Sequence, residues 1–334
     1  MAKHKSANPA ARVKLGYALS SEEQGPRELV ALARRAERCG FEFAMISDHF
    51  HPWIDRQGNA SFVWAVIGAI AQATERLRLG TGVTCPIRRI HPAILAQAAA
   101  SAASLMPGRF FFGVGTGENL NEHVIGGEWP SPAVRLEMLE ESIRILRRLW
   151  EGGMQSFRGR YFTVENAKIY NLPDEPVPVM VAAAAEQAAE LAGELGDGLI
   201  STAPMADIVE RFHRAREDGH RPVYGQLTVC WAKTQDEAKR IAHDAWPNAG
   251  IPGDLKSELP LPEHFEQATK LVTPENVAEH VVCGPDPERH LEKIREFAEA
   301  GFDHVAVHQV GADQEGFFRF YSESILPVLA ADAR

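Results

Sequence analysis

The 334-residue sequence predicts an α/β protein folded as one (β/α)8 TIM barrel that spans residues 1–334. Short runs rich in Val and Ile alternate with amphipathic stretches of helical period, as in parallel sheets buried on both faces. Eight such runs are present, and the length suits a single barrel with insertions. Eight parallel strands favour closure, because an open sheet would leave long unpaired edges. The alternative is an open doubly wound sheet, but the first strand leads into SSEEQGPREL and not into a glycine fingerprint.

The first half of the chain supplies four strand–helix units. Helix 26–39 is amphipathic, and Gly40 follows it where a C-cap needs positive φ. Pro107-Gly108 forms the turn into the fourth strand. The predicted strands are 13–19, 43–47, 77–83 and 109–115, and the helices after them are 26–39, 61–74, 91–105 and 133–150.

The second half repeats the pattern with more interruptions. Its predicted strands are 177–182, 198–201, 224–232 and 303–309, and its predicted helices are 186–195, 208–218, 235–245, 287–300 and 314–329. Residues 152–176 form an insertion with hairpin-like pieces, FRGRYFTV and AKIYNL. Residues 246–270 are Pro-rich, which predicts an irregular loop over an active site. Residues 1–12 are polar, lack the apolar core of a signal peptide, and are expected to be a loose tail.

Composition excludes several classes of protein. The net charge of -10 argues against a nucleic-acid partner, which needs a basic face, but an anionic cofactor needs only local positive groups. No apolar run reaches the length of a membrane span. The cysteines 39, 85, 230 and 283 form no CxxC pair, so reduced thiols in a cytoplasmic protein are expected, with neither a zinc site nor a disulfide framework.

Polar and small residues follow four neighbouring strands, at the end of a barrel where active sites lie. The candidates are Asp48, His49 and Trp53 after the second strand; Gly82, Val83 and Cys85 at the end of the third; Gly115, Thr116, Gly117, Glu118 and Asn121 after the fourth; and Ala183, Ala184 and Ala185 after the fifth. The small alanine side chains after the fifth strand let a ligand approach the backbone amides at the start of the next helix. Four such strand ends together predict a ligand site.

Each residue also has a structural interpretation. Asp48 could be a helix cap or a turn residue, and Glu118 could be a capping residue. His49 could be a structural histidine held by hydrogen bonds. The pairing of a carboxylate and an indole with His49 favours an acid/base role. The histidines 49, 51 and 91 lack a further ligand at fixed spacing, so no metal is predicted. A Ser/His/Asp hydrolase is excluded because no GxSxG elbow exists.

SDHFHPW and GVGTGENLNE resemble the luciferase-like superfamily, and specifically its F420-dependent glucose-6-phosphate dehydrogenase branch. The resemblance covers nearly the whole chain, from VKLGYALS to the final helix. It implies a luciferase-like TIM barrel, coenzyme F420 as cofactor, hydride transfer at a CH–OH group and a homodimer.

By position, the resemblance implies a role for each motif residue. Asp48 would lie against the deazaflavin, His49 would be the base that takes the substrate hydroxyl proton, and Trp53 would shape the pocket. Glu118 would be the acid serving the ring, and Asn121 would contact the cofactor. Gly82-Val83 would form a bulge behind the ring with a non-prolyl cis peptide at or beside it, and Cys85 replaces the usual Thr. Ala184-Ala185 replaces a Gly-Gly pair near the cofactor phosphate.

Three substrate positions depart from the branch. Met205 stands where a phosphate-binding lysine is expected, His280 stands where an arginine is expected, and Lys256 is the one basic position retained. We therefore expect a neutral alcohol, hemiacetal or carbonyl substrate and not glucose 6-phosphate. The alternatives are a sugar-6-phosphate dehydrogenase with a phosphate site rebuilt around Lys256 and Lys270, an FMN-dependent luciferase-like monooxygenase, and a barrel that binds a ligand without catalysis.

Overall fold

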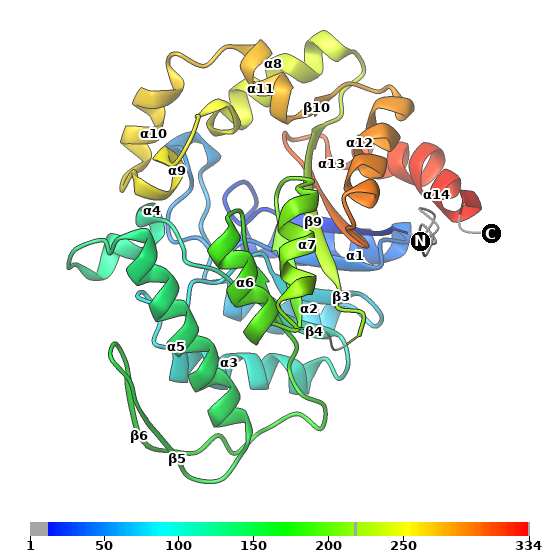
Figure 1. The fold of residues 1–334 in the computed structure, drawn as a ribbon. Helices are drawn as coiled ribbons and strands as arrows, with labels where there is room; N and C mark the ends of the chain where they lie inside the picture. The colour runs from blue at the N-terminus through cyan, green and yellow to red at the C-terminus, as the bar shows by residue number, and fades with distance from the viewer. Residues whose placement is uncertain (1–12, 217–218, 333–334) are drawn as a thin grey trace, which may run out of the picture.

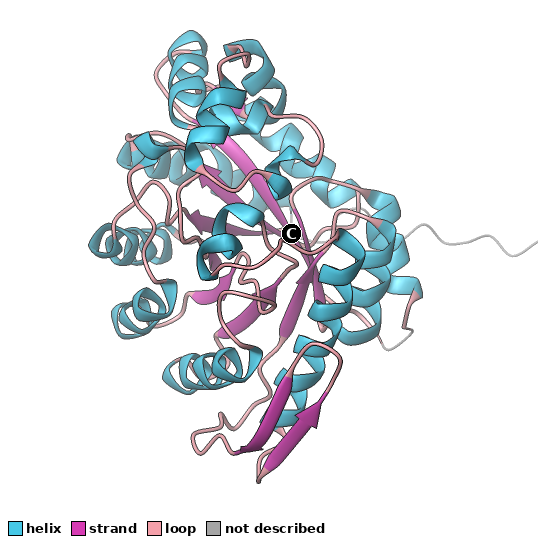
Figure 2. Ribbon diagram, turned by 90° about the vertical axis from the view of Figure 1, so that its left-hand side faces the viewer, coloured by secondary structure: helices cyan, strands magenta, loops and turns pink. Residues whose placement is uncertain are grey.

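The computed structural model describes residues 13–216 and 219–332, so the tail predicted at 1–12 lies outside the described residues. Eight parallel strands close into a barrel with helices around it (Figures 1 and 2). The barrel order is β1-β2-β3-β4-β7-β8-β9-β11, and β11 pairs back to β1. A ninth strand, β10, pairs with the end of β9. The predicted TIM barrel is therefore confirmed.

The barrel strands are short and buried, as the apolar runs predicted. They are β1 (Lys14–Leu19), β2 (Phe43–Ile46), β3 (Arg78–Thr81), β4 (Phe110–Val114), β7 (Val179–Ala182), β8 (Gly198–Ser201), β9 (Val223–Cys230) and β11 (His304–Gln309). The register pairs Leu19 with Ile46 and Leu199 with Val223. Since neighbouring strands end at nearly the same level, the residues that follow them meet at one end of the barrel.

Helices cover the outside of the barrel and cap its carboxyl end. The larger helices are α1 (Pro26–Cys39), α2 (Val63–Ala73), α3 (Pro92–Leu105), α5 (Pro132–Trp150), α6 (Glu186–Leu195), α7 (Ala206–Arg214), α8 (Gln235–Ala245), α12 (Pro287–Glu299), α13 (Gln314–Phe320) and α14 (Leu326–Asp332). A π-helical segment, Tyr321–Ile325, joins the last two, so the single helix predicted at 314–329 is interrupted there.

Two cores hold the barrel. The larger lies between strands and helices, while a smaller one fills the barrel interior. Inside, the Tyr224 ring stacks on Phe111 at 4.9 Å and on His304 at 4.2 Å. A Cβ on Gly80 would lie 2.0 Å from the Phe111 ring, so only glycine admits that ring. The filled interior leaves the carboxyl end of the barrel for a ligand.

The segment 246–270 corrects the sequence analysis. It was predicted to be an irregular loop, but it contains the 3-10 turn Pro247–Gly250 and the helices α9 (Leu255–Glu258) and α10 (Pro262–Thr269). Also unpredicted were α4 (Asn119–Glu122), α11 (Pro274–His280) and β10 (Val282–Cys283). Pro247 and Pro262 occupy first helical turns, where a missing N–H costs nothing, while Pro252 and Pro260 lie between the helical segments.

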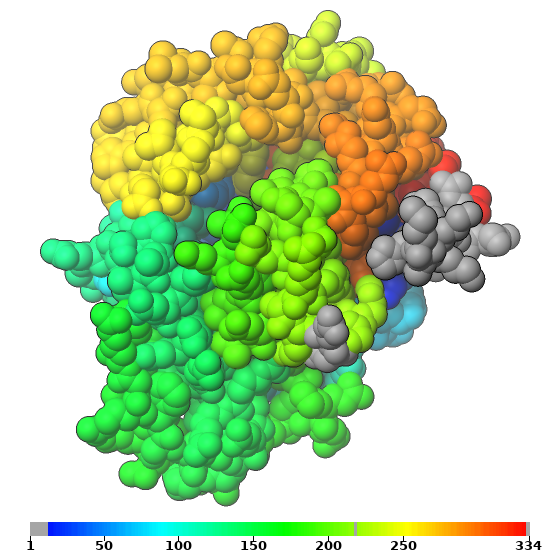
Figure 3. Space-filling view, viewed as in Figure 1, coloured from blue at the N-terminus to red at the C-terminus, as the bar shows by residue number. Residues whose placement is uncertain are grey.

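The insertion at 152–176 contains the predicted hairpin, formed by β5 (Gln155–Arg158) and β6 (Thr163–Ala167). It lies at the far end of the molecule from α9 and α10 (Figure 1). The helical segment 246–270, named here the cover, lies over the opposite end (Figure 1). A hollow opens between the cover and the green helices α6 and α7 (Figure 3). The cover, and not the hairpin, is therefore placed to enclose a ligand.

Candidate active site

The ends of β1, β2 and β4 bring three titratable side chains together. Nε2 of His49 lies 3.3 Å from Oε1 of Glu22 and 3.7 Å from Oε2 of Glu118. Nδ1 of His49 lies 3.1 Å from the carbonyl oxygen of His51, which can only accept, so Nδ1 carries a hydrogen. In the neutral ring, Nε2 is therefore the nitrogen that can take up a proton, and it lies beside two carboxylates.

Burial and charge move the pKa values of this cluster in different directions. Burial opposes the charged form of Glu22, but His49 and the Ser47 hydroxyl outweigh it and lower the pKa of Glu22. Burial likewise favours a neutral imidazole, yet Glu22 and Glu118 raise the pKa of His49. Loss of hydration raises the pKa of Glu118, although 33% of its side chain stays exposed. Glu118 is therefore the carboxyl of the pair that more readily holds a proton.

Trp53 forms a wall beside the histidine. The two rings are 5.1 Å apart and tilted, and Phe265 of the cover packs edge-on to Trp53 at 5.2 Å. The Trp53 amide donates to Oε1 of Gln57 at 2.9 Å. Trp53 thus connects the acid/base cluster to the cover.

Asn121 links the loop that carries His49 to Glu118. Its Oδ1 accepts hydrogen bonds from the amides of Phe50 and His51, at 2.9 and 3.2 Å, and its Nδ2 donates to Oε2 of Glu118 at 3.0 Å. The amide predicted to contact a cofactor is therefore engaged in holding this cluster together.

Asp48, predicted to lie against a cofactor ring, is fully buried and paired. Its Oδ1 accepts from Nη2 of Arg89 at 2.7 Å, and its Oδ2 accepts from Oγ1 of Thr84 at 2.7 Å. Asp48 is neither a helix cap nor a turn residue, which were its alternative interpretations.

The ends of β3 and β4 form a close-packed wall. The peptide between Gly82 and Val83 is cis, as predicted. A Cβ on Gly115 would lie 2.8 Å from the Val83 side chain, and one on Gly117 would lie 2.4 Å from the Cys85 sulfur. Cys85 is buried behind the Gly117 turn, and Thr116 is half-buried. This wall has the small residues that a flat ring would need.

The start of α6 leaves amides free of side-chain caps. Ala183 is buried, Ala184 and Ala185 are exposed, and Ala185 is an N-cap without a side-chain hydrogen bond. Uncapped amides at a helix start favour an anionic group. The predicted phosphate position is thus structurally suitable.

The three substrate positions lie on separate elements. Met205 is the N-cap of α7 and packs against the main core. His280 ends α11 and lines a cavity with Gln226 and Thr228 of β9, a cavity that neither Met205 nor Lys256 lines. Nζ of Lys256 donates to the Ala249 carbonyl at 3.3 Å, and this lysine is the one that interacts with Glu118.

Glu22 was missed by the sequence analysis, as were Arg89 and Glu122. Glu22 follows the first strand within SSEEQGP, so the strand-end criterion that selected His49 would have found it. That stretch was considered only for its lack of a glycine fingerprint.

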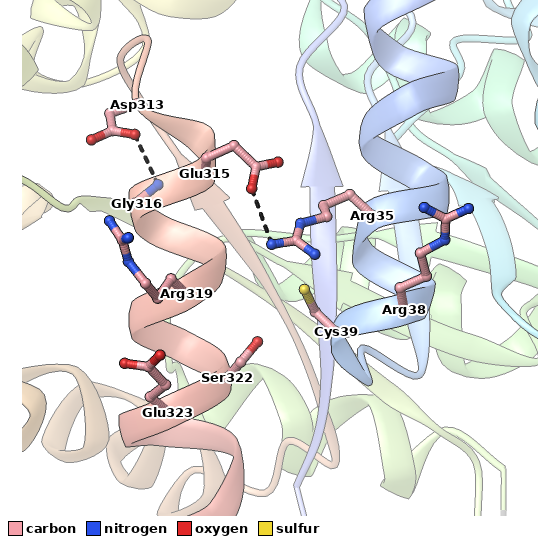
Figure 4. Close-up of a pocket in the computed structure, with 9 residues that line it drawn as sticks. All are labelled: Arg35, Arg38, Cys39, Asp313, Glu315, Gly316, Arg319, Ser322 and Glu323. Atoms are coloured by element: carbon pink, nitrogen blue, oxygen red, sulfur yellow. Dashed lines mark hydrogen bonds and ion pairs between the residues drawn. The ribbon is translucent and has the colours of Figure 1, made fainter.

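A second groove lies on the outer surface between α1 and α13 (Figure 4). Arg35 pairs with Glu315 at 3.0 Å, and Asp313 accepts from the Gly316 amide at 2.8 Å. Cys39 and further charged residues complete its lining. Both acidic and basic side chains line this groove, and none of the candidate site residues does.

Within 13–216 and 219–332, no group of three His, Cys, Asp or Glu side chains is placed to hold a metal ion. None of the helices in these ranges is long and apolar enough to cross a membrane.

The sequence profile of the luciferase-like monooxygenase family matches residues 10–304. The chain belongs to the luciferase-like family. This luciferase-like protein is 35% identical to a Nakamurella multipartita F420-dependent glucose-6-phosphate dehydrogenase, over 96% of the chain and 97% of that relative. It is 36% identical to the Rhodococcus erythropolis protein of the same name, over 96% of the chain and 99% of that relative.

Solved structures share its fold. An F420-dependent secondary alcohol dehydrogenase in complex with an F420-acetone adduct superposes with a TM-score of 0.87 and 30% identity, over 97% of this luciferase-like chain and 99% of that one. An F420-dependent tetrahydromethanopterin reductase from Methanopyrus kandleri gives a TM-score of 0.77 at 21% identity, over 96% and 100% of the two chains, which shows the fold alone.

Proposed function

We propose that this luciferase-like protein is an F420-dependent oxidoreductase that transfers a hydride between the coenzyme and a neutral alcohol, hemiacetal or carbonyl compound. The observation that carries the proposal is His49 held between Glu22 and Glu118 at the carboxyl end of the barrel. The relatives named for F420 chemistry, including the secondary alcohol dehydrogenase, support the cofactor.

The residues present fit a deazaflavin. The wall at Gly82, Val83, Gly115 and Gly117 leaves no room for larger side chains, and the uncapped amides of Ala184 and Ala185 suit a phosphate. Cys85 and Thr116 would complete the ring wall, with Asp48 and Asn121 behind it. The bound coenzyme would accept or donate the hydride, and the protein would position it.

His49 is proposed to take the hydroxyl proton at Nε2. Loss of hydride from a carbinol carbon leaves a protonated carbonyl unless a base removes that proton. Glu22 stabilises the imidazolium that results, and the Nδ1 hydrogen bond to the His51 carbonyl fixes the ring. Glu118 is proposed to hold a proton that offsets the negative charge developing on the cofactor, and Trp53 to exclude water.

The charges around the site favour a neutral substrate. A sugar phosphate carries about two negative charges and needs several cationic partners to offset its desolvation. Met205 supplies no charge, His280 is an exposed imidazole, and Lys256 already interacts with Glu118. The carboxylates of Glu22 and Glu118 would repel a further anion.

A sugar-6-phosphate dehydrogenase is the second candidate. The names of the curated relatives and the position of Lys256 favour it. The deciding measurement is kcat/KM with F420 for glucose 6-phosphate against neutral alcohols and aldehydes. We expect the neutral compounds to be preferred, and a clear preference for glucose 6-phosphate would establish the second candidate.

The cofactor is tested separately. Quenching of intrinsic fluorescence should saturate with F420 and be much weaker with FMN, whereas equal or tighter FMN binding would favour a monooxygenase. A homodimer is expected from the family resemblance and a cytoplasmic location from the cysteine spacing, and sedimentation of the purified protein tests the dimer.

A further inference from the structure

Asp48 belongs to a buried ion cluster behind the candidate cofactor wall, and the other two members, Arg89 and Glu122, have no part in the mechanism described above. Arg89 lies between two carboxylates: its Nη2 is 2.7 Å from Oδ1 of Asp48, and its Nε is 3.5 Å from Oε1 of Glu122. The Arg89 amide also donates to Oε2 of Glu122 at 2.8 Å. The exposed fractions of the Asp48, Arg89 and Glu122 side chains are 0%, 8% and 1%.

The cluster connects three strand ends. Asp48 follows β2, Arg89 follows β3, and Glu122 ends α4, which follows β4. The Glu122 amide donates to the Glu118 carbonyl at 3.2 Å, so Glu122 also anchors the helix that begins at the proposed acid. A Cβ on Gly117 would lie 3.2 Å from Cγ of Glu122, which places this carboxyl directly behind the cofactor wall.

The charges of the cluster do not balance. With Asp48, Arg89 and Glu122 all ionised, two carboxylates face one guanidinium and the cluster carries a buried negative charge. Burial raises the pKa of Glu122 to about 7, with Asp48 adding to the effect and Arg89 opposing it. The other titratable groups near it are Cys85, whose thiol pKa is also raised, and Glu118, which Lys256 of α9 faces.

We propose that Glu122 is a positioning residue whose charge, acting through Arg89 on Asp48, sets the affinity of the site for its anionic cofactor. This proposal rests on the proposed function, because it takes F420, which carries a phosphate and carboxylates, as that cofactor. While Glu122 is neutral, Arg89 pairs with Asp48 alone and the cluster adds no net charge. When Glu122 ionises, an anionic cofactor meets an added buried negative charge and binds more weakly. By linkage, F420 binding favours protonation of Glu122.

The test compares F420 dissociation constants of the wild type and Glu122→Gln at about pH 6 and about pH 8.5. Glutamine keeps an acceptor for the Arg89 amide but never ionises. We expect the two constants to agree at the lower pH and the wild type to bind about tenfold more weakly at the higher pH. A tenfold change corresponds to about 1.4 kcal/mol of repulsion between the ionised carboxylate and the anionic cofactor. Titration of the coenzyme itself affects both proteins equally, so it cancels when the two dissociation constants are divided.

Glu128→Gln is the matched control, because Glu128 is exposed on the loop after α4. The ratio of its F420 dissociation constant to that of the wild type should not change with pH. Thermal unfolding without cofactor checks that each variant is folded, and Glu122→Met, also neutral, replaces the glutamine variant if that one does not fold.

The outcomes separate the two proposals. If F420 binds but the ratio of the wild-type and Glu122→Gln dissociation constants does not change with pH, the role of Glu122 is overturned and the cofactor assignment stands. Failure of the wild type to bind F420 at either pH would overturn the cofactor assignment and the role of Glu122 with it. A buried ion pair with a merely structural role would change stability but not the pH dependence of the dissociation constant.

Discussion

Nε2 of His49 lies 3.3 Å from Oε1 of Glu22, a contact that joins the ends of two neighbouring barrel strands. Oε2 of Glu22 in turn accepts hydrogen bonds from the hydroxyls of Ser20 and Ser47. This carboxylate is buried and held in place, so it fixes both the orientation and the charge of the imidazole.

Glu22→Gln should shift the acid limb of the kcat/KM profile to lower pH. Glu22 raises the pKa of His49, and a base acts only when neutral, so activity is lost as pH falls through that pKa. Removing the carboxylate lowers the pKa of His49 and moves the acid limb to lower pH. Turnover should fall roughly 10–100-fold, as expected for losing a charge-assisted hydrogen bond of about 1.5–3 kcal/mol. An unshifted acid limb in the variant would mean that Glu22 does not tune His49.

His49→Ala should lower kcat by roughly 10²–10⁴-fold, the usual effect of removing a general base. F420 affinity should stay nearly unchanged, since His49 faces Glu22 and Glu118 and not the wall at Gly82. Steady-state kinetics and F420 fluorescence titration measure the two quantities. Near-normal turnover in this variant would leave His49 as a structural histidine.

Glu118→Gln should reduce turnover by roughly 10²-fold and flatten the basic limb of the pH profile. Loss of hydration raises the pKa of Glu118, and an acid acts only when protonated, so wild-type activity should fall as pH rises through that pKa. Glutamine has no proton to give at any pH. Glu128→Gln, an exposed neighbour, serves as control and should leave both limbs in place.

Met205→Lys combined with His280→Arg should raise kcat/KM for glucose 6-phosphate at least tenfold, about 1.4 kcal/mol of added transition-state binding. The two changes place cations where the sugar-phosphate branch is expected to carry them. Met205→Gln is the matched neutral control and should give no gain. If the double variant shows no gain either, the phosphate position inferred from the resemblance is wrong for this chain.

His290 should make the protein acid-sensitive. The ring is fully buried, with Nδ1 3.0 Å from the Tyr321 hydroxyl and Nε2 3.0 Å from the Gly284 carbonyl, and burial lowers its pKa to about 4. The unfolded chain binds this proton near pH 6.5, so the folded state loses about 3 kcal/mol of stability between that pH and about 4. Urea unfolding at several pH values across this range measures the loss of stability. In His290→Gln the free energy of unfolding should be lower at neutral pH and should lack this slope.

The sequence by itself determined the barrel and much of its chemistry. Alternating apolar and amphipathic periods are local signals, so helices such as Pro26–Cys39 and Gln235–Ala245 were predicted to the residue. The cis peptide at Gly82-Val83 came from a family resemblance carried by short contiguous motifs. Local patterns also misled, since Pro247 and Pro262 of the cover begin helical segments instead of breaking them.

Only the tertiary structure decided which side chains face one another. The register that pairs Leu19 with Ile46 brings the residues after β1 level with those after β2, and so places Glu22 against His49. Arg89 reaches both Asp48 and Glu122 because three separate loops converge at one end of the barrel. Such contacts depend on strand register and on packing between distant segments, neither of which leaves a periodic signal in the chain. The pKa shifts follow from the same burial, which is why charge in the site could be assigned only after folding.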